Sequence, residues 1–399
     1  MKRVAVAAVG VVSSLGVGAE ANLAGIREGR QGAVTLDWLA PAGLGCSTVA
    51  QVPSEVVDLP GYPDDRKVAL LAAAIEEALA GYPPDGPPER RGIFLGTGLS
   101  SVTPREIEED VSPHVRGERV DRALAMGDLS RDRVAPWRHL PERATAWGAA
   151  RIGARGPVGT TFSACAAGAE AIAAGARAVA RGEADWVIAG GYDAMIHPLG
   201  MASFDVLGVL SHQGCRPFDR RRDGFLLGEG AAVLVLVPED RCPHPLAWIL
   251  GAGSSLDASG ITAPHPEGVG AESAMRRALR DAGLRPEQVD WVHAHGTATQ
   301  VGDAVEAGAI SRVFGAGVPV SSLKGAFGHT LAAAGAVESA ATVLALRAGL
   351  IPGTAMCEEP DDFGINVLRA TTASAPKIAL SNSFGFGGQN TSVIFAAGE

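Results

Sequence analysis

Cys165 stands where the sequence changes from a strand pattern to a helix pattern. It follows the apolar segment Val158–Phe162 and starts a run rich in alanine and glycine that reaches Arg181. Backbone N–H groups and the helix dipole at a first helical turn stabilise a thiolate, so we expect the pKa of this thiol to lie below its free value of ~8.5. A small buried cysteine that fills a gap between a helix and a sheet is an equally ordinary interpretation.

Two histidines alternate in the loop His293–Asp303, which reads HAHGTATQVGD and follows a strand pattern. A histidine at a strand end, such as His295, is suited to donate a hydrogen bond to a developing oxyanion. Alternatively, the loop only caps the helix that follows, with Asp303 as the N-cap. Metal binding by the two histidines is a third interpretation, but no nearby carboxylate or thiol cluster completes four ligands.

Lys324 and His329 lie in the run Ser321–Thr330, which leads into an apolar helix pattern. Lys324 is one of four lysines among 34 basic residues, so its position is notable, although a solvated strand end would explain it as well. The dipole at a helix start biases His329 toward the neutral imidazole, which can donate a hydrogen bond.

A glycine-dense turn, Ser381–Asn390, separates two strand patterns near the C-terminus. Its glycines are either structural or arranged to cradle a phosphate. A dinucleotide-binding fingerprint would require a helix directly after the turn, and the apolar strand pattern Thr391–Phe395 follows instead. The sequence therefore excludes that kind of site.

Strand and helix patterns alternate along the chain, which predicts an α/β fold with covered sheets. The predicted strands are Val4–Val12, Gly92–Leu95, Val158–Phe162, Trp186–Ala189, Ala231–Val237, Ala247–Leu250, Trp291–Ala294, Val318–Ser321, Ile378–Ser381 and Thr391–Phe395. The predicted helices are Arg66–Ala80, Cys165–Arg181, Ala271–Ala282, Asp303–Phe314 and Thr330–Arg347. Residues 100–145 are charged and weakly periodic, so we expect a surface excursion there, near a pocket mouth.

The two halves of the sequence echo each other weakly. Val11–Leu15 (VVSSL) resembles Ala252–Leu256 (AGSSL), and each half has a strand, a turn, a reactive side chain and an alanine-rich helix. The reactive side chain is Cys165 in the first half and His329 in the second. Related halves that meet at these helix starts would place both groups in one site.

Composition limits the possible functions. The 399 residues carry a formal charge of −10, and no basic run with interleaved aromatics occurs, which argues against nucleic-acid binding. The five cysteines are scattered without a CxxC pair, which indicates free thiols in a reducing, cytoplasmic location. Met1–Ala21 mimics a secretion signal, but an opening strand and turn explain it. No segment has the ~20 uninterrupted apolar residues of a membrane span.

Taken together and in this order, the motifs resemble those of the elongating β-ketoacyl-acyl-carrier-protein synthases of the thiolase superfamily. The resemblance covers nearly the whole chain and adds the run DGFLLGEG, Asp223–Gly230, to the motifs above. It implies a thiolase-like five-layer αβαβα sandwich built from two similar halves. Residues 1–245 would hold the cysteine and residues 246–399 both histidines.

The resemblance also implies the chemistry of the matching residues. Cys165 is expected to accept an acyl chain from an acyl carrier protein, while His295 and His329 support loss of CO₂ from a malonyl unit and stabilise the enolate. Lys324 is expected to orient this pair, with Glu306 as its ionic partner. The reaction is a decarboxylative Claisen condensation in fatty-acid, polyketide or polyene synthesis, and it requires no metal or organic cofactor.

Further matching residues are expected to contact substrate or partner. Backbone N–H groups of Cys165 and Phe386 would form the oxyanion hole, and the Phe386 ring would gate the acyl chamber. The side chains expected at the pantetheine arm and the acyl chain are Thr297, Thr299, Phe204 and Phe384. Arg66 and Lys67 are expected to dock the carrier protein. Dimerisation would use first-half strands, with a second copy or a chain-length-factor-like subunit.

One departure and two alternatives accompany the resemblance. Many family members hold a monovalent cation with an asparagine at the position of His293, so no metal is expected here. A non-catalytic chain-length factor usually lacks the cysteine or a histidine, whereas Cys165, His295 and His329 are all present. Thiolases, which condense without decarboxylation, use a second cysteine where this chain has the turn around Phe386.

Overall fold

The computed structural model describes residues 2–37, 39, 46–53, 65–98, 112–116, 119–120 and 140–398. Most of the predicted surface excursion at residues 100–145 lies outside the described residues. Its last part starts a helix, α5 (Glu142–Ile152), that the sequence did not predict.

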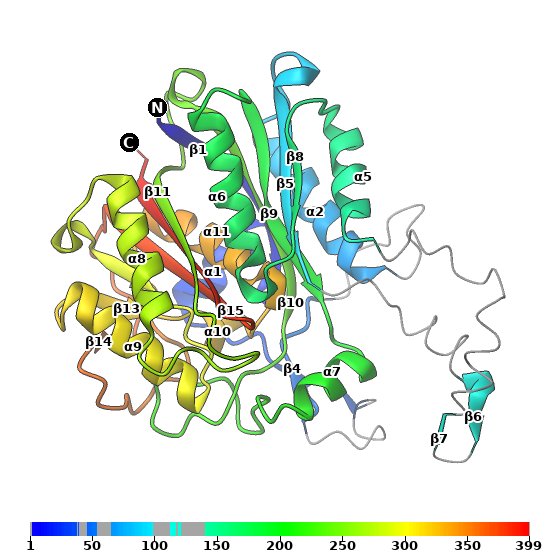
Figure 1. Ribbon diagram of the computed structural model, residues 1–399, viewed down its shortest axis with the longest axis vertical. Helices are drawn as coiled ribbons and strands as arrows, with labels where there is room; N and C mark the ends of the chain where they lie inside the picture. The colour runs from blue at the N-terminus through cyan, green and yellow to red at the C-terminus, as the bar shows by residue number, and fades with distance from the viewer. Residues whose placement is uncertain are drawn as a thin grey trace.

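The main sheet has 12 strands and consists of two topologically similar halves (Figure 1). The strands of the first half are β1 (Val4–Ser13), β5 (Arg91–Thr97), β8 (Val158–Thr161), β9 (Trp186–Ala194) and β10 (Glu229–Pro238). The strands of the second half are β11 (Ala247–Leu256), β12 (Trp291–His293), β13 (Pro319–Ser321), β15 (Ile378–Gly385) and β16 (Gln389–Ala397). Shorter strands are β2 (Gly16–Val17), β3 (Val34–Thr35), β4 (Thr48–Val49), β6 (Val115–Arg116), β7 (Arg119–Val120) and β14 (Asn366–Val367).

The two halves share one strand order. It runs β8-β5-β9-β10-β1 in the first half and β13-β12-β15-β16-β11 in the second, with equivalent strands in the same places. In both halves the first two pairings are parallel and the next two antiparallel. The halves join where Val4–Val6 of β1 pairs with Ala247–Ile249 of β11. The prediction of two similar halves is confirmed, while their status as separate domains divided at residue 245 stays a prediction.

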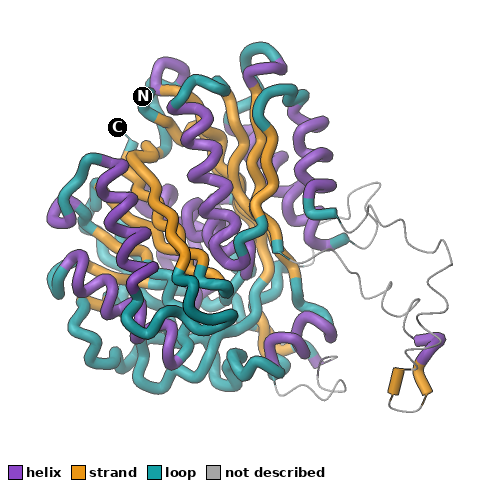
Figure 2. Tube along the Cα trace, viewed as in Figure 1, coloured by secondary structure: helices purple, strands orange, loops and turns teal. Residues whose placement is uncertain are grey.

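Helices form three layers around the two halves of the sheet (Figures 1 and 2). α2 (Arg66–Gly81) and α5 pack on the outer face of the first half. α6 (Ala167–Ala180) and α11 (Ala334–Arg347) lie between the halves, and α8 (Val269–Ala282) and α9 (Gln300–Phe314) cover the outer face of the second. The result is the predicted αβαβα sandwich. The remaining α-helices of the described chain are α1 (Ala19–Glu28), α7 (Pro198–Asp205) and α10 (Lys324–Phe327).

Small residues let the two central helices approach closely. A Cβ added at Gly168 of α6 would lie 2.8 Å from the backbone nitrogen of Ala336 in α11, and one added at Gly335 would lie 2.7 Å from the backbone nitrogen of Ala169. Each distance is too short for any side chain, so glycine is required at both crossings. This packing brings the start of α6, which follows Cys165, against the second half of the protein.

Every predicted strand and helix is present, although β9 and β11 extend well past their predicted ends at Ala189 and Leu250. The added residues are rich in glycine and serine, which have weak strand propensity, and tertiary packing orders them. A Cβ at Gly190, for example, would lie 2.0 Å from the carbonyl oxygen of Ala232. The signal-like N-terminal segment forms β1 inside the main sheet.

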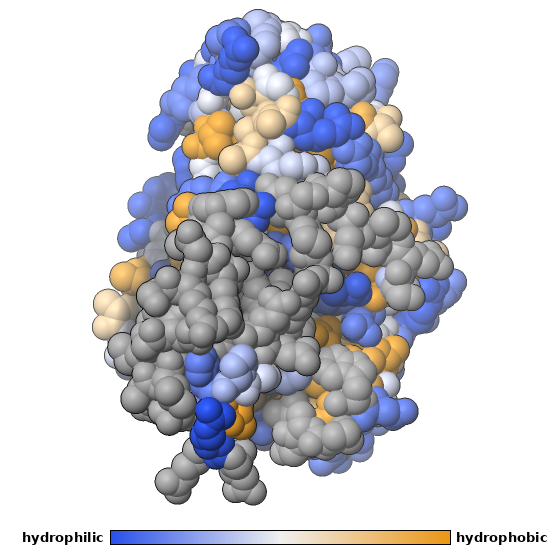
Figure 3. All heavy atoms as spheres, turned by 90° about the vertical axis from the view of Figure 1, so that its right-hand side faces the viewer, coloured by the Kyte–Doolittle hydropathy of each residue, from blue (hydrophilic) through white to orange (hydrophobic). Residues whose placement is uncertain are grey.

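In the described part of the chain, no helix combines the length and apolar character that a membrane crossing requires. The described side chains on the face shown in Figure 3 are mostly hydrophilic, with separate smaller hydrophobic areas between them.

Candidate active site

Cys165 lies in a tight turn between β8 and α6. The turn is a 3₁₀ segment, Ala164–Ala166, whose first residue has the left-handed φ of +46°. The second half has the same turn conformation before α11, where Leu331, the first residue of the 3₁₀ segment Leu331–Ala333, has a φ of +52°. A non-glycine residue in this region costs about 1–3 kcal/mol, so the packing of both halves must hold these turns. The repeat places His329 just before the turn that corresponds to that of Cys165.

The Cys165 thiol is buried and protonated at neutral pH. Burial raises the pKa of Cys165 to about 11, although the positive charge of Lys324 and the backbone N–H of Phe386 act in the opposite direction. The expected lowering of this pKa is therefore wrong, because removal from water outweighs the effects of Lys324 and of the Phe386 N–H. A nucleophilic role requires a base when the substrate arrives.

His295 follows β12 and is held through its backbone and its ring. Its backbone N–H donates to Oε1 of Glu306 at 2.8 Å, and the next N–H, that of Gly296, donates to Oε2 at 2.7 Å. Nζ of Lys324 lies 3.1 Å from Nδ1 of His295 and donates to the His295 carbonyl oxygen at 2.5 Å. Because the ammonium has only donors, Nδ1 of His295 is an acceptor.

His329 is fixed by the segment Leu226–Gly228 of the DGFLLGEG run. Its backbone N–H donates to the Leu226 carbonyl at 2.8 Å, and Gly228 N–H donates to its carbonyl at 2.9 Å. Nδ1 of His329 accepts a hydrogen bond from the backbone N–H of Leu331 at 3.3 Å. The ring contacts that of Phe225 edge to face, with centroids 4.9 Å apart.

The two imidazoles lie together as a pair of neutral donors. Their ring centroids are 5.3 Å apart and the ring planes are nearly perpendicular. Burial, followed by the charge of Lys324, holds the pKa of both His295 and His329 well below the usual histidine range. Since Nδ1 is an acceptor in each ring, the single proton of each neutral ring is on Nε2. The site thus contains two N–H donors that resist protonation.

The expected ion pair between Lys324 and Glu306 is wrong. Lys324 instead forms an ion pair with Oε1 of Glu338 from α11, and both side chains are fully buried. Glu306 accepts hydrogen bonds from the two backbone N–H groups at His295 and from the Asn382 side chain at 3.1 Å. Its role in the structure is to hold the His295 loop at the start of α9.

The N-cap of α9 is Thr299 rather than the expected Asp303. Oγ1 of Thr299 accepts from the backbone N–H of Gly302 at 3.1 Å and lies 3.0 Å from Oγ1 of Thr297. Asp303 lies one turn further on, where its carboxylate accepts from the backbone N–H groups of Phe218 and Ala298. The loop of residues 297–299 is therefore held both by the Thr299 cap and by the Asp303 carboxylate.

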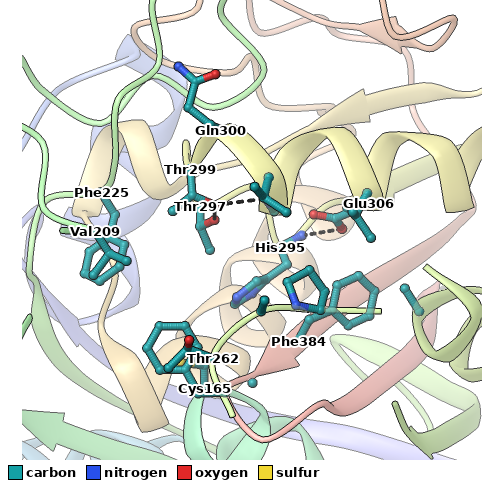
Figure 4. Close-up of a pocket in the computed structure, with 18 of the residues that line it drawn as sticks. Cys165, Val209, Phe225, Thr262, His295, Thr297, Thr299, Gln300, Glu306 and Phe384 are labelled. Carbon is teal, nitrogen blue, oxygen red and sulfur yellow. Dashed lines mark hydrogen bonds between the residues drawn. The ribbon is translucent and has the colours of Figure 1, made fainter. Parts of the chain in front are cut away.

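Two cavities meet at Cys165. The first, of about 340 Å³, is lined by both imidazoles, Thr297 and Thr299, and Figure 4 shows Cys165, His295 and Phe384 facing this space. The second, of about 440 Å³, is lined by Phe204 and mostly by other apolar residues. Cys165 and Phe386 line both cavities. A thioester at Cys165 would therefore have room in both cavities.

Family models match most of the chain. Residues 64–241 match the β-ketoacyl synthase N-terminal domain and residues 246–358 its C-terminal domain. The chain belongs to the β-ketoacyl synthase family. It is 34% identical to the mitochondrial 3-oxoacyl-[acyl-carrier-protein] synthase of Arabidopsis thaliana, over 99% of this chain and 93% of that protein.

Solved structures of ketosynthases are similar over the full length. The ishigamide ketosynthase/chain length factor has a TM-score of 0.87 and 32% identity, with 99% of both chains covered. A type II PKS ketosynthase in complex with its acyl-carrier protein, bound to a hexaketide, also has a TM-score of 0.87, with 27% identity and 99% of both chains covered. These likenesses confirm the thiolase-like fold.

The residues expected to dock a carrier protein are engaged within this synthase. Lys67 is only 4% exposed, and its Nζ lies 3.0 Å from Oδ1 of Asp193. This burial contradicts the docking role predicted for Lys67. Arg66 is about one-third exposed and forms a short ion pair with the buried Glu229, so little of its charge is available to a partner.

The residues around His293 do not fit the alkali cation that many family members bind. Oε1 of Glu338 pairs with Lys324, while its Oε2 is buried without a hydrogen-bond partner. His293 contributes an imidazole whose Nδ1 lies 2.8 Å from Oγ1 of Thr342. Hard cations prefer oxygen ligands. Among the described residues, no group of three or more His, Cys, Asp or Glu side chains could hold a metal ion.

Sequence reasoning missed Asp193 and Gln389 as residues of the site, and it did not connect Glu338 with Lys324. Glu338 had a signal, because it is the single acidic residue in the otherwise apolar and small-residue helix α11. Asp193 and Gln389 lie at a strand end and a strand start, and only the fold shows that both line the second cavity.

Proposed function

We propose that this chain catalyses a decarboxylative Claisen condensation that joins an acyl group to a malonyl-derived unit on a carrier protein. The arrangement of one thiol and two neutral Nε2–H donors around one cavity carries this proposal. The names of the relatives, 3-oxoacyl-[acyl-carrier-protein] synthase and ketosynthase, agree with it. The product would be a β-ketoacyl carrier protein.

In the first step, the Cys165 sulfur attacks the thioester carbonyl of an acyl carrier protein. A C–S bond forms to Cys165 and the carrier's C–S bond breaks, while the thiol proton leaves with the carrier's sulfur. Because the thiol is protonated at rest, its proton must leave during the attack and pass to the departing carrier sulfur. Backbone N–H groups of Cys165 and Phe386 would stabilise the oxyanion.

In the second step, malonyl carrier protein enters the first cavity and loses CO₂. The electron pair of the broken C–C bond passes to the thioester oxygen, which becomes an enolate. Nε2–H of His295 and Nε2–H of His329 would donate to this oxygen. The lowered pKa values of His295 and His329 favour neutral rings. The enolate carbon then attacks the carbonyl carbon of the acyl group, a C–C bond forms, and the bond from that carbon to the Cys165 sulfur breaks.

The two cavities provide separate places for the two ends of the substrate. Thr297 and Thr299 in the first cavity would contact the pantetheine arm of the carrier protein, near Phe384. Phe204 in the second cavity would contact the acyl chain, and the Phe386 ring between the cavities would control access to it. Arg66 remains a weaker candidate for carrier docking.

The assembly belongs to the proposal as well. We expect a dimer through the edge strand β8, with a second copy or a chain-length-factor-like subunit, in the cytoplasm. Phe162, next to β8, is 52% exposed and also lines the second cavity, so a partner strand there would close the cavity's outer side. A non-catalytic role is disfavoured because the thiol and both imidazoles are assembled.

Mass spectrometry of the protein after incubation with acyl carrier protein thioesters tests the proposal. The protein should gain one acyl mass on the peptide that contains Cys165, and Cys165→Ala should gain none. Cys357→Ala, which alters a buried cysteine outside both cavities, serves as the matched control and should be acylated like the wild type. Acylation of Cys165→Ala at the wild-type rate would overturn the assignment.

A further inference from the structure

Arg222 lies directly before the DGFLLGEG run and is almost fully buried, at 5% exposure. Its guanidinium reaches the start of α9, where Nε donates to the Thr299 carbonyl at 3.3 Å and Nη2 donates to the Gln300 carbonyl at 3.0 Å. In the other direction, Nε2 of Gln300 donates to the Arg222 carbonyl at 2.5 Å. Arg222 thus contacts the loop of residues 297–299 from behind the first cavity, which it does not line.

Other contacts fix the guanidinium in this position. Nη1 of Arg222 pairs with Oδ2 of Asp361 at 2.8 Å and donates to the Asp219 carbonyl at 3.2 Å. The guanidinium carbon lies 4.7 Å from the centre of the Phe363 ring, so the cation also contacts an aromatic face. A planar guanidinium has five donors in a fixed fork and can serve all of these acceptors at once, which a lysine ammonium cannot do.

The stability of α9 does not explain this position. The N-terminus of a helix has a partial positive charge, so a cation there is unfavourable for the helix itself. The carbonyls of Thr299 and Gln300 are the first of α9, and that of Thr299 already accepts from the backbone N–H of Asp303 at 3.3 Å. The position of Arg222 is explained instead by the loop that the contact holds.

This loop has a strained backbone. Ala298, between the two threonines, has a left-handed φ of +63°. Its N–H donates to the Asp303 carboxylate, and its carbonyl accepts from the backbone N–H of Gly224 at 3.0 Å. Residues other than glycine keep such a conformation only where the surrounding structure enforces it, and they are frequent at functional sites. Arg222 and the residues that follow it are part of that structure.

The loop has one hydroxyl proton available for a ligand. Oγ1 of Thr297 and Oγ1 of Thr299 lie 3.0 Å apart at the first cavity, so one hydroxyl donates to the other. Oγ1 of Thr299 also accepts from the backbone N–H of Gly302. The two hydroxyls have two protons and use one between them, so the second proton can be donated to a carbonyl in the cavity. The pantetheine arm of a carrier protein contains amide carbonyls of this kind.

We propose that Arg222 is a positioning residue for the pantetheine arm: its guanidinium fixes the loop of residues 297–299 so that the second hydroxyl proton meets an amide carbonyl of the arm. The inference rests on the proposed function, because it requires a carrier-protein thioester in the first cavity. Arg222 does not touch the reacting atoms. Its loss should therefore weaken binding of the arm and leave the chemical step at Cys165 unchanged.

Acylation of Cys165 by two thioesters of the same acyl group tests this proposal. Octanoyl-pantetheine contains the amides of the arm, and the S-ethyl thioester of octanoate lacks them. The rate of mass gain at Cys165, measured against thioester concentration, gives the KM and the maximal rate for each.

Three variants are compared with the wild type. Arg222→Met removes the guanidinium. Arg222→Lys keeps a charge opposite Asp361 without the fork, and it takes the place of the methionine variant if that one does not fold. Arg221→Met is the matched control, because Arg221 pairs with Asp219 and Glu358 rather than with the loop.

Both Arg222 variants should raise the KM for octanoyl-pantetheine by about three- to tenfold, the value of one hydrogen bond, at an unchanged maximal rate. Acylation by the ethyl thioester should stay as in the wild type, and Arg221→Met should match the wild type with both substrates. An unchanged KM for octanoyl-pantetheine would overturn the inference. An equal loss with the two thioesters would also overturn it, since Arg222 would then only stabilise the fold. Failure of both thioesters to acylate Cys165 of the wild type would instead overturn the proposed function.

Discussion

The Lys324 ammonium contacts Nδ1 of His295 at 3.1 Å and forms a buried ion pair with Glu338. One cation thus joins the two sides of the site, because His295 follows a strand of the second sheet half and Glu338 belongs to the central helix α11. The contact fixes the proton of His295 on Nε2, and the ion pair compensates a carboxylate with no exposure to water.

Replacing Lys324 separates its effect on the His295 proton from its effect on the stability of the fold. Burial raises the pKa of Glu338 to about 7 even beside Lys324, so Lys324→Met leaves a buried, protonated carboxyl without its partner. The free energy of unfolding should fall by about 1–3 kcal/mol. The double variant Lys324→Met/Glu338→Leu should recover much of this stability without recovering CO₂ release from malonyl carrier protein. Urea unfolding and a CO₂ assay measure the two properties, with the exposed Lys377→Met as control. Wild-type CO₂ release by the double variant would show that Lys324 does not act on His295.

The reactivity of Cys165 should rise steeply with pH. The pKa of about 11 means that nearly all of the thiol is protonated at neutral pH, and each unit of pH increases the thiolate fraction about tenfold. The rate of carbamidomethylation of Cys165, measured by peptide mass, should therefore climb about tenfold per unit between about pH 6 and about pH 9. A plateau that begins near neutral pH would indicate a stabilised thiolate and contradict the dominance of burial.

Decarboxylation should respond differently to pH. The pKa values of His295 and His329 lie well below the usual range, so both rings stay neutral as the pH falls from about 8 to about 6. CO₂ release by enzyme already acylated at Cys165 should consequently be flat over this interval. A drop centred on the ordinary histidine pKa, about 6.5, would show that one imidazole is protonated in the working enzyme.

Substitution by alanine should have opposite effects at two helical glycines, because only Gly168 lies at the close crossing of α6 and α11. Gly168→Ala places a methyl group 2.8 Å from the Ala336 nitrogen and should cost about 1–3 kcal/mol in the free energy of unfolding. Gly308→Ala in α9 meets only the end of the Arg312 side chain, at 3.4 Å, and should stabilise by about 0.4–1 kcal/mol. Thermal unfolding of both variants checks the sign. Equal stability of the two would contradict the packing described between the halves.

Much of the fold was predictable because strand and helix patterns are strong in the buried elements. β1 and α11 are almost fully buried, and their apolar runs identified them. The sequence missed α1 and α7, whose surroundings in the chain combine turn residues with a weak apolar pattern. It also missed the far ends of β9 and β11, where packing rather than propensity orders glycine and serine.

The candidate site was predictable in its chemical groups but not in its electrostatics. The order of motifs identified Cys165, His295, His329 and Lys324, which the fold brings to one place. The partner of Lys324 could not be read from the sequence, because Glu306 and Glu338 are both acidic residues of nearby helices and only their orientation decides. The raised pKa of Cys165 and the burial of Lys67 likewise depend on how much protein surrounds each group.

The joint action of the two imidazoles on one enolate is the central claim of the proposed mechanism. CO₂ release from malonyl carrier protein, measured for the wild type, His295→Leu and His329→Leu, tests it most directly, with the exposed His244→Leu as control. Each active-site variant should lose about 10²–10³-fold in rate, the cost of removing one donor from an oxyanion site. Wild-type CO₂ release by either variant would contradict the claim.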